Sequence, residues 1–234
     1  MTKMELLFIK EMFDSIAPKY DFLNRFLSLG QDLFWRKEMV KAAHISNKTK
    51  VLDVACGTCD VALEIKKQTN KSTKIFGVDF SHKMLALGKK KIHCYDSNIY
   101  LTAGNALNLP FKNNLFNTIL IAFGIRNIIN RKKVLIEFYN SLKIDGKIII
   151  LELTSPEHIF LKKLYMVYFK KILPFFGGIF SKNHKAYQYL QSSVIKFPEA
   201  HSFVDIMKQA EFSKIKWKNM TFGIVTLFVG TKTR

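Results

Sequence analysis

Short apolar runs alternate with helix-length segments between residues 50 and 153, and this alternation restricts the possible folds more than any other feature of the chain. The predicted strands are 50–55, 74–80, 99–103, 116–123 and 147–153. The predicted helices between them are 60–68, 82–92 and 130–142. The run Ile148-Ile149-Ile150-Leu151 has no polar alternation, which is typical of a strand buried on both faces. The alternation therefore favours an α/β fold with a mostly parallel sheet and right-handed crossovers.

The two ends of the chain have a different pattern. Residues 4–44 read as helices, with breaks near Ala17-Pro18 and at Gly30. Residues 157–173 and 199–210 also predict helices. Near the C-terminus, 213–219 and 222–231 predict two strands joined by Met220-Thr221. This pair would add an antiparallel edge to the sheet.

A small-residue loop follows the first predicted strand, where Val54 leads into Ala55-Cys56-Gly57-Thr58. Such a loop at the carboxyl end of a parallel sheet lets backbone N–H groups approach a ligand. Asp79 ends the second strand, 22 residues after Gly57. An acid at about this spacing binds a ribose diol in nucleotide-type folds, because a carboxylate accepts both hydroxyl protons. The alternative role for Asp79, a helix N-cap, is better filled by Ser81.

The loop lacks the features of a dinucleotide site. The pattern G-x-G-x-x-G is absent, since Gly57 is the only glycine of the loop, and no basic or glycine-rich phosphate cradle accompanies it. A ribose-bearing ligand without phosphate fits better, and this points to S-adenosylmethionine. Gly104-Asn105-Ala106 follows the third strand, and the Asn105 amide is suited to an adenine edge because it carries both a donor and an acceptor.

Cys56 and Cys59 leave an alternative open, because C-x-x-C at a strand-to-helix junction is also typical of a thioredoxin-like redox pair. A zinc site would need further ligands, for which His93 and Cys94 are the nearby residues. Neither alternative explains Asp79, and we expect no metal. Cys59 stands where such loops often have a third glycine, so its side chain must point away from the ligand or crowd it.

Several blocks along nearly the whole chain match one known family. The N-terminal matches are Met12-Phe13-Asp14-Ser15-Ile16-Ala17, Tyr20-Asp21, Asn24, Leu27-Ser28 and Trp35-Arg36. The others are Ala55-Cys56-Gly57-Thr58 with Asp60, Gly104-Asn105-Ala106 with Leu109-Pro110-Phe111, Phe123-Gly124-Ile125-Arg126-Asn127, and Tyr187-Gln188-Tyr189-Leu190 with Ser193-Val194 and Phe197-Pro198. Together these blocks resemble the quinone-biosynthesis C-methyltransferases, which use S-adenosylmethionine to methylate demethylmenaquinol or the related ubiquinone precursor. The chain departs from the family pattern at Cys59, usually glycine, and at Gln191-Ser192, usually Pro-Glu or Ala-Glu.

The resemblance implies a Rossmann-like class I methyltransferase fold over residues 1–234 as a single domain. Its expected parts are a helical cap (1–44), a cofactor-binding core (50–155), an insertion facing substrate and lipid (156–198), and a C-terminal helix with a strand pair (199–234). The expected cofactor is S-adenosylmethionine, and the residues expected to bind it are Gly57, Thr58, Asp79, Asn105 and Ala106.

The reaction needs a nucleophilic ring carbon, which a hydroquinol acquires when its hydroxyl loses a proton. We expect Arg126 to stabilise the phenolate charge, Asn127 to position the hydroxyl or a water, and Tyr20 to relay a proton. Structural alternatives exist: Arg126 pairs with Asp21 or Asp14, and Asn127 caps the following helix. The predicted activity is methylation of demethylmenaquinol. The alternatives are the benzoquinol precursor of ubiquinone, an RNA-binding methyltransferase, and a ligand-binding relative without activity.

Charge and hydropathy bear on where the protein works. The chain has 37 Lys and Arg against 18 Asp and Glu, a net charge of +19, yet only five of the basic residues are Arg. Because base readers favour Arg, we expect no nucleic-acid partner and attribute most of the charge to lysine drift. We find no signal peptide and no uncharged apolar stretch of about 18 residues, so we expect a cytoplasmic protein.

The substrate expected from the resemblance, a polyprenyl quinol, is almost insoluble, so we also expect peripheral contact with the inner face of the membrane. At helical spacing an apolar side gathers Leu161, Leu164, Tyr165, Tyr168, Phe169 and Ile172. The lysines 162, 163 and 170 lie opposite, with Lys171 at the flank, and the apolar run 174–180 follows. A basic amphipathic helix with aromatics suits a membrane interface. The alternative is a helix docked on the sheet with its lysines in water. The oligomeric state is left open.

Overall fold

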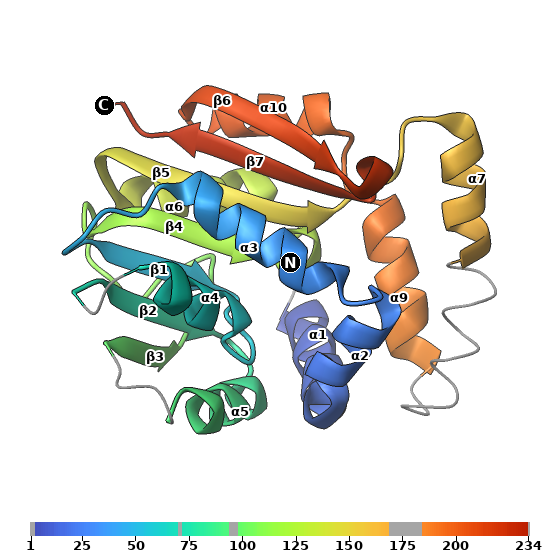
Figure 1. Cartoon of the computed structure of the whole chain (residues 1–234), viewed down its shortest axis with the longest axis horizontal. Helices are drawn as coiled ribbons and strands as arrows, with labels where there is room; N and C mark the ends of the chain where they lie inside the picture. The colour runs from blue at the N-terminus through green and yellow to red at the C-terminus, as the bar shows by residue number, and fades with distance from the viewer. Residues whose placement is uncertain (1–2, 70–71, 94–97, 169–183, 234) are drawn as a thin grey trace.

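The strands form one sheet in the computed structural model, which describes residues 3–69, 72–93, 98–168 and 184–233 (Figure 1). Within these residues the strand order is β3-β2-β1-β4-β5-β7-β6. The strands are β1 (Lys50–Val54), β2 (Lys74–Asp79), β3 (Ile99–Ala103), β4 (Phe116–Ala122), β5 (Leu142–Leu153), β6 (Ser213–Met220) and β7 (Val225–Thr231). The first five are parallel, and β7 runs antiparallel between β5 and β6. The predicted fold class is confirmed, and the C-terminal pair supplies the antiparallel edge.

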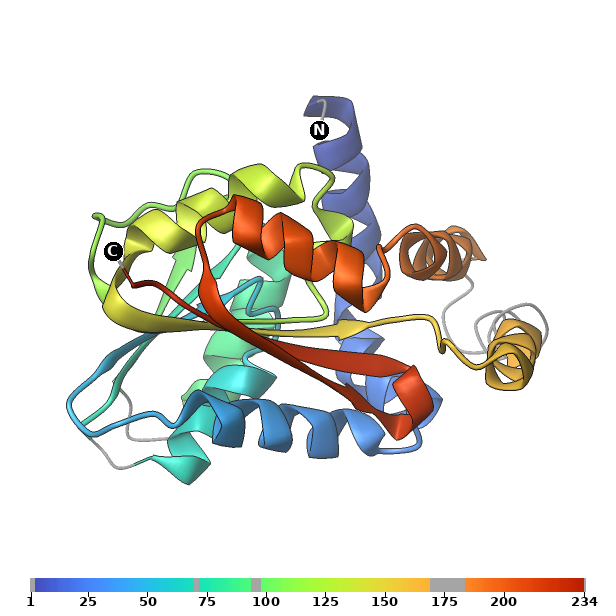
Figure 2. The same ribbon diagram turned by 90° about the horizontal axis from the view of Figure 1, so that it is seen from above.

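Helices cover both faces of this sheet (Figure 2). On one face lie α3 (Gln31–Ala43) and α4 (Asp60–Gln68), and on the other lie α6 (Arg131–Ser141) and α10 (Ala200–Gln209). In β5, Ile149 and Leu151 pack in the core under α3 and α4, whereas Ile148 and Ile150 pack under α6 and α10. All four side chains are fully buried, as expected for a strand covered on both faces.

Four of the predicted strands, those at 50–55, 74–80, 99–103 and 116–123, match the structure to within one residue. The fifth begins earlier than predicted, at Leu142 instead of residue 147. Asp145, which lies in this additional part of the strand, has a left-handed φ of 62°. However, its N–H donates to the Lys232 carbonyl at 2.8 Å, so the chain continues along the sheet.

The connection between the last two strands is also longer than the predicted Met220-Thr221. The 3-10 turn Thr221–Gly223 joins β6 to β7. Thr221, Phe222 and Gly223 all have positive φ values, and Phe222 is largely exposed. Three left-handed residues in succession bend the chain without pairing it, so β7 begins only at Val225.

A second group of helices gathers at the carboxyl end of the parallel strands (centre and right in Figure 1). The cap consists of α1 (Lys3–Ile16), the 3-10 helix Ala17–Lys19, α2 (Tyr20–Leu27) and α3, so the helical breaks lie where Pro18 and Gly30 predict them. Beside it stand α7 (Ile159–Val167) and α9 (His184–Ile195). The prediction of a helix over 157–173 is met by α7, and residues 169–183, including the run 174–180, lie outside the described residues. Among the described residues no helix combines the length and the hydropathy needed to cross a bilayer.

Candidate active site

Two neighbouring cavities open at the carboxyl end of the sheet. The first, here called the loop cavity, has walls from the loops after β1 to β4, including Gly57, Asp79, Asn105, Ala106 and Asn127. The N-terminal helix α1 adds Leu6, Ile9 and Phe13 to it. The cavity therefore brings together four of the five residues expected to bind the cofactor, and the cap covers it.

The second, here called the aromatic cavity, lies between the cap, α7 and α9. Its aromatic lining comprises Phe13, Tyr20, Trp35, Phe123, Tyr165, Tyr168 and Tyr189. Charged side chains on its wall are Asp32, Arg36 and Arg126. Phe13, Tyr20 and Phe123 line both cavities, so the two sites meet at these rings.

Asp79 organises the glycine loop. Its carboxylate accepts the N–H of Gly57 at 2.8 Å and the N–H of Ser81 at 2.8 Å. Burial raises the pKa of Asp79, and these N–H donors oppose that effect. The hydroxyl of Ser81 accepts the Met84 N–H at 3.1 Å, so Ser81 is the N-cap of α5 (His82–Ile92). The helix-cap alternative for Asp79 is therefore wrong.

Asn105 and Ala106 lie just beyond β3. The Asn105 side-chain oxygen accepts the N–H of Leu107 at 3.0 Å, which fixes the amide against its own loop. Gly57 has a left-handed φ of 52°, a conformation that glycine adopts without steric cost.

Thr58 is placed differently from the other expected cofactor residues. Its hydroxyl donates to the Asp21 carboxylate of α2 at 2.5 Å, and the side chain is not part of the loop-cavity wall. Thr58 thus links the glycine loop to the cap.

Ion pairs extend this link. Asp60, the first residue of α4, pairs with Arg25 of α2 at 2.8 Å and with Lys91 of α5. Arg36 pairs with Asp32 at 2.5 Å and lies 3.9 Å from Asp60. Burial raises the pKa of Asp60, but Arg36 and Lys91 outweigh it, so that pKa is lowered. Ion pairs therefore hold the cap to the first residue of α4 and to α5.

Cys56 and Cys59 do not form a reactive pair. Both thiols are buried, and the hydrogen bond to Cys59 together with burial raises the pKa of Cys56 well above its ordinary value. A redox pair needs an accessible thiol with a lowered pKa, so the structure argues against that alternative. Cys59 packs in the core under α3 and α4, pointing away from the loop cavity. Cys94, which a zinc site would have needed, lies outside the described residues.

Arg126 is buried in the turn after β4, and its partner is Glu152 of β5. The guanidinium Nη1 lies 2.7 Å from Oε1 of Glu152, and the Arg126 N–H donates to Oε2 at 3.0 Å. Nη1 also donates to the carbonyl of Phe123, a residue with a left-handed φ of 58°. The predicted alternative of a pair with Asp14 or Asp21 is wrong, because these accept from Ser81 and from Thr58 and Lys91.

Asn127 faces the loop cavity, and its side-chain oxygen accepts the Tyr189 hydroxyl at 3.1 Å. Asn130, not Asn127, caps α6 by accepting the N–H of Lys133 at 3.0 Å. Tyr20 lines both cavities, with its ring 6.2 Å from that of Phe13. The three residues expected to be catalytic thus surround the junction of the two cavities.

Two features of the site were not predicted from the sequence: Glu152 as the buried partner of Arg126, and the tyrosines Tyr165, Tyr168 and Tyr189 as wall residues of the aromatic cavity. The signal for Glu152 was an acid directly after the buried run Ile148-Ile149-Ile150-Leu151, where a charge is costly unless it is paired. Burial raises the pKa of Tyr168 to about 12 and also raises that of Tyr189. These hydroxyls therefore stay neutral and serve as hydrogen-bond donors.

The arrangement suits two ligands that meet end to end. A buried carboxylate beside a glycine loop can take a ribose diol in the loop cavity. The aromatic cavity can take a flat apolar ring and present a ring hydroxyl to an arginine and a tyrosine.

Comparison with known proteins agrees with this geometry. The model of the ubiE/COQ5 methyltransferase family matches residues 1–232. The chain is 46% identical over 226 residues to the ubiquinone/menaquinone biosynthesis C-methyltransferase UbiE of Geotalea uraniireducens, covering 96% of each chain. It is 36% identical to the demethylmenaquinone methyltransferase of Anoxybacillus flavithermus, covering 96% of this chain and 95% of that one.

Solved structures share the fold at low identity. One is a SAM-dependent methyltransferase of Thermotoga maritima, described as a possible histamine N-methyltransferase, with a TM-score of 0.67 and 20% identity. The match covers 96% of this chain and 99% of that one. Another is phosphoethanolamine N-methyltransferase 2 of Haemonchus contortus in complex with S-adenosyl-L-methionine, with a TM-score of 0.61 and 16% identity over 92% of this chain and 60% of that one.

Proposed function

Since this chain belongs to the ubiE/COQ5 methyltransferase family, we propose that it methylates a ring carbon of demethylmenaquinol to give menaquinol. It is a methyltransferase, and its cofactor is S-adenosylmethionine. The observation that carries the choice of substrate is the aromatic cavity, which adjoins the loop cavity through Phe13, Tyr20 and Phe123. A fused aromatic ring with hydroxyl groups matches its aromatic wall and its buried arginine.

The loop cavity fits the cofactor chemically. Asp79 offers a buried carboxylate for the ribose hydroxyls, and Gly57 leaves the backbone accessible beside it. Asn105 and Ala106 form the wall proposed for the adenine. When bound there, the sulfonium supplies a methyl group that is already activated.

The protein's part in the reaction is to align the ring and to make its carbon nucleophilic. The quinol hydroxyl loses a proton, and we assign to Tyr20 the role of relaying this proton away. The negative charge that is left spreads to the ring carbon. Arg126 stabilises this charge, and Asn127 holds the hydroxyl or a water. With the cofactor bound, the ring carbon would gain the methyl group while the electron pair of the broken C–S bond stayed on sulfur, and the ring C–H proton would leave to restore aromaticity. Alignment alone contributes up to roughly 7–11 kcal/mol in well-oriented reactions.

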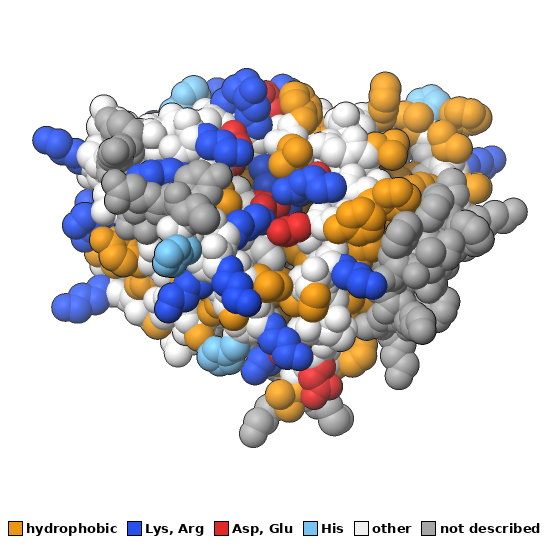
Figure 3. All heavy atoms as spheres, turned by 60° about the horizontal axis from the view of Figure 1, so that its bottom comes forward, with side chains coloured by type: hydrophobic (Ala, Val, Ile, Leu, Met, Phe, Trp, Pro, Cys, Tyr) orange, Lys and Arg blue, Asp and Glu red, His pale blue; other side chains and the backbone are white. Residues whose placement is uncertain are grey.

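The polyprenyl benzoquinol precursor of ubiquinone is the alternative substrate. Relatives of this chain carry both kinds of name, UbiE at 46% identity and demethylmenaquinone methyltransferase at 36%. The RNA-binding alternative has no support in these names. In Figure 3 the Lys and Arg side chains are scattered over the visible face and do not form one patch.

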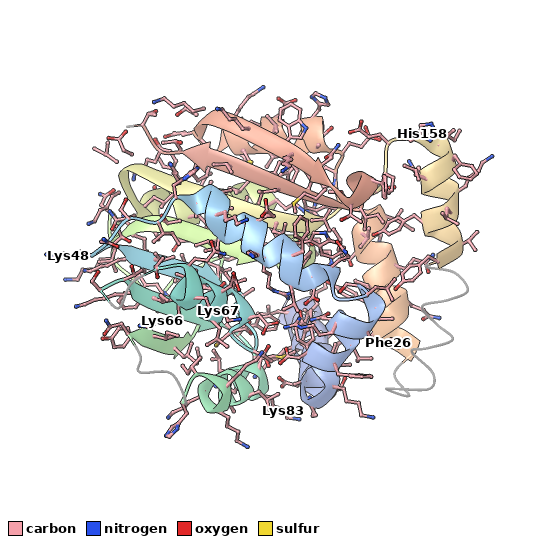
Figure 4. The ribbon with its side chains drawn as sticks, viewed as in Figure 1. Phe26, Lys48, Lys66, Lys67, Lys83 and His158 are labelled. Carbon is pink, nitrogen blue, oxygen red and sulfur yellow. The ribbon has the colours of Figure 1, made fainter. Side chains whose placement is uncertain are left out.

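We propose that the protein is cytoplasmic and meets its substrate at the membrane surface through α7. Tyr165 of this helix and its C-cap residue Tyr168 line the aromatic cavity, whereas Phe160 and Leu164 are 66% and 60% exposed. The helix thus connects the cavity to an exposed apolar surface, and the exposed Lys162 and Lys163 lie beside it. Lys48, Lys66 and Lys67, labelled in Figure 4, lie on the other side of the molecule from α7, so these three lysines are not part of the proposed membrane-facing surface.

The test is transfer of labelled methyl groups from S-adenosylmethionine to quinols reduced in lipid vesicles. We expect label in menaquinol when demethylmenaquinol is supplied, and a parallel arm with the polyprenyl benzoquinol measures the alternative. Transfer to the benzoquinol alone would replace the proposed substrate by the alternative. No heat in calorimetry with S-adenosylmethionine and no thermal shift would support the ligand-binding relative, in which Cys59 has spoiled the loop, instead.

A further inference from the structure

Glu152 is the buried charge that the proposed mechanism does not use. It is the second-to-last residue of β5 and is fully buried. It lines neither cavity, so it does not touch the substrate. An ionised carboxylate in such a place needs partners, because burial of an unpaired charge is very costly.

Among the described residues, the hydrogen-bond partners of the Glu152 carboxylate lie on the turn that carries Arg126 or on β5 itself. Oε1 accepts Nη1 of Arg126 at 2.7 Å and the N–H of Leu153 at 2.8 Å, and Oε2 accepts the main-chain N–H of Arg126 at 3.0 Å. One carboxylate therefore fixes both the backbone and the guanidinium of Arg126. Nε of Arg126 has no hydrogen-bond partner among the described residues, so this arginine keeps one donor unused.

The pair also sets the charge at the cavity. Burial lowers the pKa of Arg126, but Glu152 outweighs it, so that pKa is raised and the guanidinium stays charged. The titratable groups around the pair come from every neighbouring element: Tyr20 of α2, Asp32 and Arg36 of α3, Arg131 of α6, Tyr165 of α7 and Tyr189 of α9. Asp32 is already paired with Arg25 and Arg36. Glu152 is therefore the carboxylate that offsets Arg126.

We propose that Glu152 is a positioning residue for the reaction: it holds Arg126 at the wall of the aromatic cavity and offsets its charge, and so sets the acidity of a quinol hydroxyl bound there. This inference rests on the proposed function. Without the Glu152 charge, Arg126 would stabilise the phenolate more strongly. The phenolate would form at lower pH and would be a weaker nucleophile.

The test uses Glu152→Gln, which keeps the shape and removes the charge. We expect the acidic limb of the kcat–pH profile to move to lower pH by about one unit or more, while the plateau kcat falls. The matched control is Glu157→Gln, an exposed glutamate in the loop after β5, which we expect to leave the profile unchanged. A lower kcat with an unmoved profile would mean that Glu152 only supports the fold, and would overturn the proposal.

A second variant and a probe other than turnover keep the test decisive if Glu152→Gln folds poorly. The double variant Arg126→Met with Glu152→Gln replaces a buried ion pair by neutral groups, a change that proteins often tolerate.

The probe is 1-naphthol, whose ionisation is followed by absorbance when it is bound together with S-adenosylhomocysteine. We expect the hydroxyl of bound 1-naphthol to ionise at lower pH in Glu152→Gln than in the wild type, and at higher pH in the double variant. Equal values in the wild type and the double variant would overturn the proposal. A wild type that neither binds 1-naphthol nor methylates a quinol would contradict the proposed function itself.

Discussion

A β-carbon added to Gly88 of α5 would lie 2.5 Å from Sγ of Cys59. Cys59 stands in the glycine loop with a left-handed φ of 71°, and its thiol fills the space that the missing side chain of Gly88 leaves open. The loop therefore accommodates a cysteine at a position often held by glycine, because the facing residue of α5, Gly88, has no side chain.

Gly88→Ala should lower the free energy of unfolding by about 1–3 kcal/mol, because overpacking forces neighbouring atoms to move. Cys59→Gly should remove the collision and also suits the left-handed backbone. We expect the double variant to recover most of the loss, as measured by urea denaturation of all four proteins. Losses that simply add would mean that the thiol and the helix do not share this space.

Asp79→Asn should weaken S-adenosylmethionine binding by about ten- to a hundredfold, because a charged acceptor contributes roughly 1.5–3 kcal/mol. Calorimetry measures the affinity directly. Ser81→Ala is the control, since it removes the N-cap of α5 at a cost of about 1 kcal/mol in stability and should leave the affinity nearly unchanged. Equal losses of affinity in both variants would assign the effect to the loop as a whole.

Arg126→Ala should lower kcat by about 100- to 1,000-fold, as the removal of a charge-stabilising donor does in other active sites. The affinity for the cofactor should change little, because Arg126 lines the aromatic cavity and not the loop cavity. Lys132→Ala, an exposed residue nearby on α6, serves as the control. Parallel loss of kcat and cofactor affinity would argue against a role in the chemistry.

Stability should depend on pH through Asp53, a fully buried residue of β1. Burial raises its pKa from 3.8 to about 8, and Arg36 opposes this shift. Between these values the folded chain holds a proton that the unfolded chain has lost, so the contribution of Asp53 to stability is fully present below pH 3.8 and is lost as the pH rises towards 8. The slope is at most about 1.4 kcal/mol per pH unit for one group.

Urea denaturation from pH 5 to pH 9 of the wild type and Asp53→Asn isolates this contribution. Asparagine resembles the neutral carboxyl group, so the variant should lose less stability than the wild type over the lower part of the range. Parallel curves would show that Asp53 is ionised in the folded protein.

The membrane proposal predicts that the protein sediments with anionic phosphatidylglycerol vesicles at low salt and is released at high salt. Phe160→Ser with Leu164→Ser should lower the bound fraction, because these side chains form the exposed apolar surface of α7. Ile144→Ser is the matched control, since Ile144 is 63% exposed at the opposite end of β5. No binding at either salt concentration, or an equal loss in the control, would contradict the proposal.

The sequence was sufficient for the parts of the site that depend on local pattern. Gly57 and Asn105 follow predictable strands and Asp79 ends one, and parallel strands bring their carboxyl ends to one edge. Contacts between distant segments were not predictable in the same way. Thr58 lies in the glycine loop, yet its hydroxyl bonds to Asp21, because the cap folds over that loop. Likewise, the partner of Arg126 was sought among nearby acids of the cap, whereas it lies on β5, beside β4.

The position of α1 has a consequence for how the chain folds during synthesis. This helix is made before the sheet, but Leu6, Ile9 and Phe13 face loops as far along as Ile128, and the ring of Phe8 contacts Tyr189 of α9. The cap therefore cannot complete its contacts until most of the chain has been made, so its apolar side chains remain uncovered while the sheet assembles. The aromatic cavity, which has Tyr189 and Leu190 in its wall, can therefore close only after α9 has been made.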